Sequence, residues 1–185
     1  MTTAPLAPEE RRRLLHVARG AIRARLSGEP PPGGDDTPRL REPGGAFVTL
    51  RRREDGELRG CVGYVEPHFP LVEAVARAAV AAALEDGRFD PVTEAELPSL
   101  AIEISVLGRT SPIRPGDVEI GTHGLIIRCG GRSGLLLPQV PVEHGWDRDV
   151  FLAETCRKAG LPRDAWKRAD AELLGFTAEV LGEED

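Results

Sequence analysis

Asparagine is absent from this 185-residue chain, and lysine occurs only as Lys158 and Lys167. Glutamine and methionine occur once each, as Gln139 and Met1. A shortage of thermolabile amides together with 16 prolines suits a protein from a heat-tolerant organism. The same bias arises in a GC-rich genome, because lysine and asparagine codons are AT-rich. The composition predicts one of these two origins and does not choose between them.

Long apolar runs are also missing, which bears on where the protein works. No stretch approaches the roughly 18 residues that a membrane span needs. The first eight residues are neither basic nor followed by an apolar run, unlike a signal peptide. We therefore expect a cytoplasmic protein without a membrane anchor.

The chain also has few cysteines and no surplus of positive charge. The three cysteines, at positions 61, 129 and 156, have no CxxC spacing, which argues against a disulfide framework and a zinc finger. The formal net charge is -6, whereas nucleic-acid-binding domains normally carry a basic surplus. The basic run at 51–53 is followed by acidic residues and indicates a solvated hairpin end. Nucleic acid is therefore not the partner we expect.

The chain does contain a regular succession of patterned segments. Its length fits one domain over residues 1–185, with a flexible Pro- and Gly-rich loop at 28–45 and room for a smaller subdomain of undefined bounds. Hydrophobic spacing, caps and turns predict helices at 8–26, 70–85 and between Asp147 and Gly160, and strands at 46–53, 58–64, 100–107, 121–127, 135–137 and 176–180. Because short turns join several strands, we expect an α+β fold with a mainly antiparallel sheet flanked by helices.

The segment at 58–64, Leu-Arg-Gly-Cys-Val-Gly-Tyr, is the densest candidate for chemistry. Strand periodicity places Arg59, Cys61 and Gly63 on one face. A nearby cation favours a thiolate, and Gly60 and Gly63 leave room for another backbone or a ligand. The structural alternative is a small buried cysteine beside a bulge, and these seven residues alone favour that alternative.

A second candidate is His123, which lies between Gly121 and Gly124. It is the plausible base for a Cys61 nucleophile, and Glu143 is the nearest group to orient it or to act as acid or base. Cys61, His123 and Glu143 would also suit a catalytic zinc or iron, although no ligand-spacing motif supports a metal. The structural alternative for His123 is a ring that bonds a backbone group in its glycine-flanked turn.

Six motifs occur in order along the chain: Phe47-Val48-Thr49-Leu50, Leu58-Arg59-Gly60-Cys61-Val62-Gly63, Ile102-Glu103-Ile104-Ser105-Val106-Leu107, Gly121-Thr122-His123-Gly124-Leu125, Leu136-Leu137-Pro138-Gln139-Val140 and Lys158-Ala159-Gly160-Leu161-Pro162. Together they are similar to the AMMECR domain family, whose prokaryotic members are called AmmeMemoRadiSam system protein A. The similarity extends from about the first helix to the last strand and departs at residues 86–91, which read Asp-Gly-Arg-Phe-Asp-Pro where the family usually has Asp-Pro-Arg-Phe-Pro-Pro.

The resemblance implies an α+β fold with a larger and a smaller subdomain, a cytosolic setting, and radical-SAM and MEMO-like proteins as partners. It implies neither a reaction nor a cofactor. It does raise the expectation that Cys61, His123 and Glu143 form a functional cluster, since all three lie in or beside family motifs.

The resulting functional prediction is a small cytosolic enzyme with Cys61 as nucleophile, His123 as general base or acid and Glu143 to orient it. Acyl transfer, hydrolysis or a related covalent step on a small molecule or a modified residue would suit these groups. The alternative is a module that binds a partner protein or nucleic acid through the Arg59 and Cys61 face. The expected binding residues are Arg59, Gly60, Gly63, Arg88 and Gln139.

Overall fold

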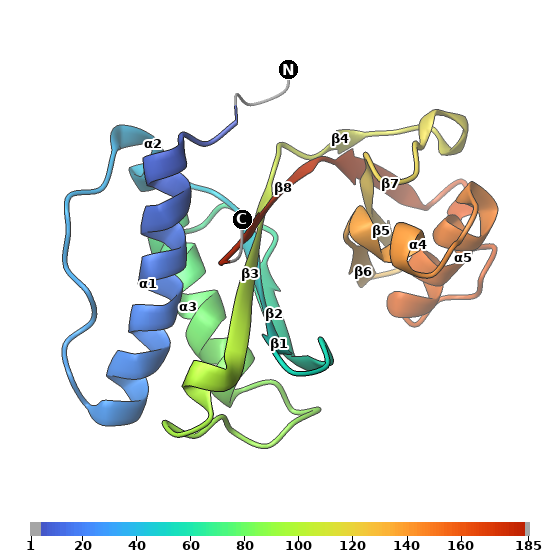
Figure 1. Cartoon of the computed structure of the whole chain (residues 1–185). Coiled ribbons are helices and arrows are strands. Elements are labelled where there is room, and N and C mark those ends of the chain that lie inside the picture. The colour runs from blue at the N-terminus through green and yellow to red at the C-terminus, as the bar shows by residue number, and fades with distance from the viewer. Residues whose placement is uncertain (1–4, 184–185) are drawn as a thin grey trace. The chain divides into compact units, whose positions relative to one another are not determined.

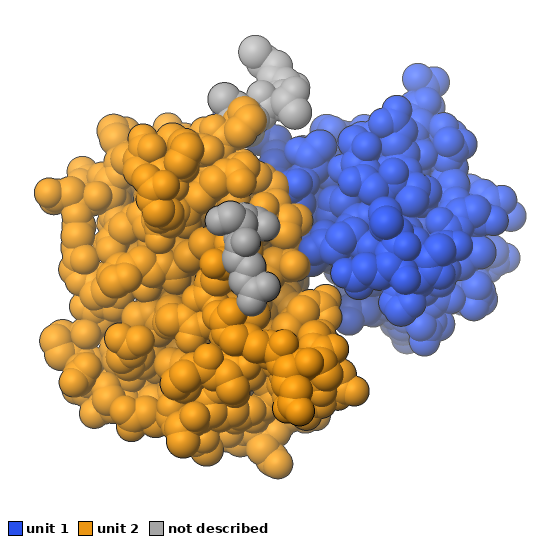
Figure 2. Space-filling view, viewed as in Figure 1, with its two compact units in different colours: residues 1–3, 108–178 blue, residues 4–107, 179–185 orange. Residues whose placement is uncertain are grey.

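The computed structural model describes residues 5–183 and divides the chain into two compact units (Figures 1 and 2). Within the described residues, the large unit comprises 5–107 and 179–183, and the small unit comprises Gly108–Ala178. Each unit has its own four-stranded sheet. The predicted α+β class is confirmed, because the chain combines helices with antiparallel strand pairs.

The large unit packs helices on one face of its sheet. The long helices α1 (Pro8–Ser27) and α3 (Leu71–Leu84) lie side by side against the sheet in Figure 1. Pro8 occupies the first turn of α1, and Gly28 ends the helix in the left-handed conformation with φ 77°. The alanines of α3 are mostly buried, so the helix backbone comes close to its neighbours.

The sheet of the large unit has the strand order β2-β1-β3-β8, and its named pairs β1–β2 and β1–β3 are antiparallel. Its strands are β1 (Ala46–Arg52), β2 (Leu58–Tyr64), β3 (Leu100–Leu107) and β8 (Ala178–Gly182). The predicted Asp-Gly turn joins β1 to β2, with Gly56 at φ 72°. Strand β2 lies at the sheet edge and carries the Cys61 motif.

The register of the β1–β2 pair shifts by one residue near the hairpin end. Leu50 lies opposite Gly60, but Arg51 lies opposite Leu58, so Arg59 is an extra residue on β2. Such a β-bulge breaks the period of two on which the sequence prediction depended. Further along β2 the alternation holds, because Val62 and Tyr64 pack on the core formed with α1 and α3.

The small unit has the sheet order β4-β7-β5-β6. Its strands are β4 (Ser111–Pro112), β5 (Gly124–Cys129), β6 (Arg132–Leu136) and β7 (Glu172–Phe176), and its helices are α4 (Gln139–Glu143) and α5 (Arg148–Lys158). Helix α5 begins as predicted, because Asp147 Oδ1 accepts the Val150 amide at 2.9 Å. Phe151 is fully buried beside Leu125, Val118 and Leu152.

Some expected elements differ from the observed ones. The single last strand at 176–180 is wrong: the chain forms β7 and β8 on either side of Thr177, and these belong to different sheets. The loop at 28–45 contains a short helix, α2 (Pro38–Arg41), whose N-cap is Thr37. Residues 121–123 form a turn before β5 instead of its first part. Short 3₁₀ turns lie at Leu97–Ser99, Pro115–Asp117 and Ala165–Lys167.

None of the helices between residues 5 and 183 combines the length and the apolar character that crossing a bilayer requires.

Candidate active site on the Cys61 strand

Cys61 differs from the other two cysteines in its exposure. All three thiols are free, but Cys129 and Cys156 are buried whereas Cys61 is half-buried. Burial raises the pKa of the Cys156 thiol, which keeps it protonated and inert. Cys61 is therefore the least buried of the three cysteines.

Two side chains hold Cys61 in place. The Thr49 hydroxyl, from the facing residue of β1, donates to Cys61 Sγ at 3.4 Å. The Cys61 amide points away from β1 and donates to Asp86 Oδ2 at 2.9 Å. Thr49 and Asp86 thus fix Cys61 through its side chain and through its backbone.

Asp86 also holds Arg88 beside Cys61. Arg88 donates to the carboxylate from Nε at 2.9 Å and from Nη2 at 2.6 Å, while its own amide donates to Asp86 Oδ1 at 3.2 Å. Arg88 Nη2 also donates to the Cys61 carbonyl at 3.4 Å. The Arg88 guanidinium holds the pKa of Asp86 well below its usual range, with the Cys61 amide adding to the effect. The predicted binding residue Arg88 thus contacts the Cys61 backbone.

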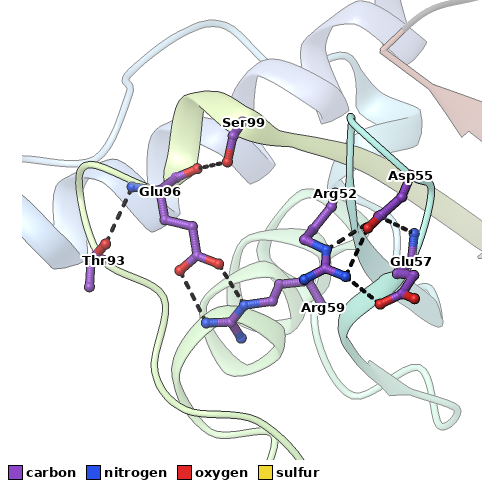
Figure 3. Close-up of polar contacts among 7 residues, drawn as sticks. All are labelled: Arg52, Asp55, Glu57, Arg59, Thr93, Glu96 and Ser99. Atoms are coloured by element: carbon purple, nitrogen blue, oxygen red, sulfur yellow. Dashed lines mark hydrogen bonds and ion pairs between the residues drawn. The ribbon is translucent and has the colours of Figure 1, made fainter.

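Arg59 is held by a different carboxylate. Its Nε and Nη2 donate to the two oxygens of Glu96 at 2.6 and 3.1 Å, a two-point pair visible in Figure 3. Glu96 is itself positioned by the chain around the Leu97–Ser99 turn: its amide donates to Thr93 Oγ1 and its carbonyl accepts from Ser99 Oγ. The Arg59 side chain is only 14% exposed.

The two candidate glycines are accounted for by packing within the protein. A Cβ on Gly60 would lie 2.1 Å from the Ala82 carbonyl oxygen, so Gly60 lets α3 approach β2. A Cβ on Gly63 would lie 2.3 Å from the Phe47 ring, which covers it across the strand pair. The room predicted at Gly60 is therefore filled by another backbone, and that at Gly63 by an aromatic side chain.

An open pocket of about 500 Å³ lies next to this strand, within the large unit. Its wall consists of the hairpin end and the loop after α3, and it is lined by Arg52, Glu57, Leu58, Arg59, Gly87, Arg88, Phe89 and Asp90. The Phe89 ring lies near two guanidinium groups, with Cζ of Arg59 at 5.9 Å and Cζ of Arg88 at 5.4 Å from its centroid. Cys61 does not line this pocket, but Arg59 and Arg88 connect the two features.

His123, Glu143 and Gln139 lie in the small unit, whereas Cys61, Arg59 and Arg88 lie in the large one. His123 Nδ1 accepts the Glu119 amide at 3.0 Å, so the neutral ring carries its proton on Nε2. A Cβ on Gly121 would lie 3.3 Å from the Val142 side chain, which places the turn before His123 against α4. Glu143 is the last residue of α4 and is exposed. A joint role with Cys61 stays a prediction.

Over the described residues, no group of three or more His, Cys, Asp or Glu side chains is placed to hold a metal ion.

Sequence reasoning missed four residues of this site: Thr49, Asp86, Phe89 and Glu96. The Asp86-Gly87-Arg88 order was a usable signal, because an aspartate before glycine often bonds backbone amides two residues on. No such local signal marks Glu96, because it lies 37 residues from its partner Arg59.

Comparisons with known proteins agree on the family. Protein MK0488 of Methanopyrus kandleri is 47% identical over 189 residues, covering 97% of this chain and 91% of that protein. A protein of Thermococcus gammatolerans is 48% identical, with 92% and 89% covered. The crystal structure of the uncharacterized protein PH0010 from Pyrococcus horikoshii matches with a TM-score of 0.91 at 44% identity, covering 97% of this chain and 94% of that one. The AMMECR1 family model matches residues 15–181, so the chain belongs to the AMMECR1 family.

Proposed function

We propose that this AMMECR1 protein is a cysteine-dependent enzyme in which Cys61 is the nucleophile. The supporting observation is the contrast among the three cysteines: two are buried, whereas Cys61 is half-buried, accepts a hydroxyl bond from Thr49 and has the Arg88 guanidinium at its carbonyl. Reactive cysteines lie in electropositive, partly exposed surroundings, and structural cysteines are buried and inert.

Acyl transfer or hydrolysis fits such a thiol. The Cys61 thiol loses its proton to a base, Sγ bonds to the acyl carbon, and the bond to the leaving group breaks as that group takes up a proton. Water or another acceptor then cleaves the thioester and returns the thiol. The acyl compound is a small molecule or a modified residue.

His123 and Glu143 remain the predicted acid–base pair. The hydrogen bond from the Glu119 amide fixes the neutral His123 ring in the tautomer with the proton on Nε2, so Nδ1 is already engaged. To act as a base, this ring would have to give up its turn contact, because Nδ1 carries the only free lone pair of the neutral ring.

The experiment is site-resolved alkylation of the native protein with iodoacetamide, quantified by mass spectrometry. Cys129 and Cys156 serve as internal controls, since they are buried in the same molecule. The proposal predicts that Cys61 alone reacts at neutral pH and that the other two react only after unfolding. A Cys61 that stays unreacted until the protein unfolds would contradict it.

A Cys61→Ser variant separates an enzyme from a binding module. Radical-SAM and MEMO-like proteins are the partners predicted from the family resemblance, and a pull-down of each measures binding. Loss of cellular activity with partner binding retained supports an enzyme. Retention of both would favour the alternative, a module that presents the Cys61 strand to a partner.

A further inference from the structure

We propose that the pocket beside β2 binds a zwitterionic ligand of the amino-acid type, with its carboxylate on Arg59 and its ammonium group on Asp90. This inference deepens the proposed function by naming a ligand class. The volume of the pocket, about 500 Å³, lies within the range of small-molecule sites and is ample for one amino acid with a large side chain.

The anionic half of the ligand is inferred from Arg59. Glu96 engages Nε and Nη2, but Nη1 is buried and has no acceptor within hydrogen-bond distance in the part of the chain that is described. A buried donor of a charged group without a partner is costly, so an acceptor at this position is strongly favoured. Because Glu96 already fixes the guanidinium plane, little ordering remains to be done when a carboxylate binds.

The cationic half is inferred from the charge of the pocket. Each of its three arginines is already matched: Arg52 with Asp55 and Glu57, Arg59 with Glu96, and Arg88 with Asp86. Asp90 adds a further carboxylate to the wall and forms no ion pair with any residue between 5 and 183. The lining itself holds three guanidinium groups and two carboxylates, Glu57 and Asp90. Glu57 is engaged by Arg52, so Asp90 is the lining carboxylate that is available to a ligand. This arrangement favours a ligand that brings its own positive charge to Asp90.

An apolar wall is available for the ligand's side chain. Phe89 and Leu58 both line the pocket. Nη1 has no solvent-exposed surface, and the centroid of the Phe89 ring lies 5.9 Å from Arg59 Cζ. The proposal therefore requires the Phe89 ring to turn aside when the carboxylate binds. Gly87 has open space around its Cα, which leaves the loop room to move.

The test is a titration of the full chain with four probes, followed by NMR of its amide signals. L-phenylalanine carries both charges, 3-phenylpropionate lacks the ammonium group, phenylethylamine lacks the carboxylate, and inorganic phosphate represents a simple anion. The proposal predicts that L-phenylalanine binds most tightly and shifts the signals of Gly87 and Phe89. Tighter binding of phosphate, or no shift at these residues with L-phenylalanine, would overturn it.

Two variants assign the two halves of the ligand. Arg59→Lys should weaken L-phenylalanine and 3-phenylpropionate alike, by about tenfold or more, because a charge-assisted hydrogen bond is lost. Asp90→Asn, an exposed position, should weaken L-phenylalanine by about two- to fivefold and leave 3-phenylpropionate unchanged. Equal binding of these two probes to the native chain would refute the zwitterion.

A matched control and a check of independence complete the design. Arg77→Lys alters another arginine that lies over a phenylalanine ring, Phe69 at 4.5 Å, and pairs with Glu73, but lies outside this pocket. It should leave all four affinities unchanged, and a loss equal to that of Arg59→Lys would place the ligand elsewhere. Cys61→Ser should also bind L-phenylalanine normally. An unreactive Cys61 with intact binding would therefore refute the proposed function alone, and a reactive Cys61 without binding would refute this inference alone.

Discussion

The Asp86 carboxylate accepts the Cys61 amide at 2.9 Å, which ties the loop after α3 to the middle of an edge strand. One carboxylate thus serves two purposes. It satisfies a backbone donor that no neighbouring strand reaches, and it fixes the Arg88 guanidinium next to the candidate nucleophile.

Removing the Asp86 charge should destabilise the protein in a pH-dependent way. Its pKa is lowered in the folded state, so the stabilisation is present above the unfolded pKa, about 3.9, and is lost as pH falls through the folded value. We expect Asp86→Asn to reduce the free energy of unfolding by about 1–3 kcal/mol at pH 7, since the carboxylate is largely buried. Urea unfolding at pH 7 and pH 3 measures the difference.

The Arg168–Asp170 pair provides the control. It has the same two-residue separation and bonds at 2.9 Å, but both side chains are more than half exposed. Asp170→Asn should therefore leave the unfolding free energy almost unchanged. Equal effects of the two substitutions would show that burial of Asp86 is unimportant.

Neutralising Glu96 should leave the Arg59 guanidinium poorly compensated in a site that is mostly shielded from water. We expect Glu96→Gln to cost about 1–3 kcal/mol, less than a fully buried pair would because Glu96 is 28% exposed. Glu73→Gln breaks the more exposed pair with Arg77 and should have little effect. Thermal unfolding of both variants and of the native protein measures the two changes in stability.

A methyl group at Gly60 should be poorly tolerated. It would meet the Ala82 carbonyl oxygen at 2.1 Å, so β2 and α3 must separate, at a cost of about 1–3 kcal/mol. Gly87→Ala adds the same methyl group where nothing lies within 4 Å and should be neutral or slightly stabilising. Equal stability of the two variants in denaturant unfolding would contradict the close packing of α3 against β2.

Arg88 should influence the reactivity of Cys61. Replacing it with glutamine removes the cation at the Cys61 carbonyl, and we expect alkylation at neutral pH to slow by about threefold or more. Arg128→Gln, in the small unit and paired with Glu172, should not change the rate. An unchanged rate in Arg88→Gln would show that the guanidinium at the Cys61 carbonyl does not influence the thiol.

Features that depend on residues close together in the sequence could be predicted, whereas features that depend on distant residues could not. The Asp55-Gly56 turn and the Asp147 cap were recognisable, because each acts on residues a few positions away. The bulge at Arg59 was not, because it depends on how β2 aligns with β1. The division of the last strand at Thr177 was missed for a similar reason. Apolar residues on both sides of Thr177 fit one continuous strand, and no local feature indicates that β7 and β8 belong to different sheets.

The candidate site shows the same limit. Cys61, Arg59 and Arg88 were named from short motifs, and Cys61 is indeed the least buried cysteine. Their carboxylate partners Asp86 and Glu96 were not, since these pairings arise only when the loop after α3 folds back onto β2.

The position of Cys61 on an unpaired edge has a consequence for the behaviour of the protein at high concentration. An open edge strand offers its outward amide and carbonyl groups to a strand of another molecule, which is a route to aggregation. Asp86 and Arg88 occupy one such pair of groups, the amide and the carbonyl of Cys61. The two side chains that contact the Cys61 backbone therefore also obstruct the pairing of another molecule's strand at this position.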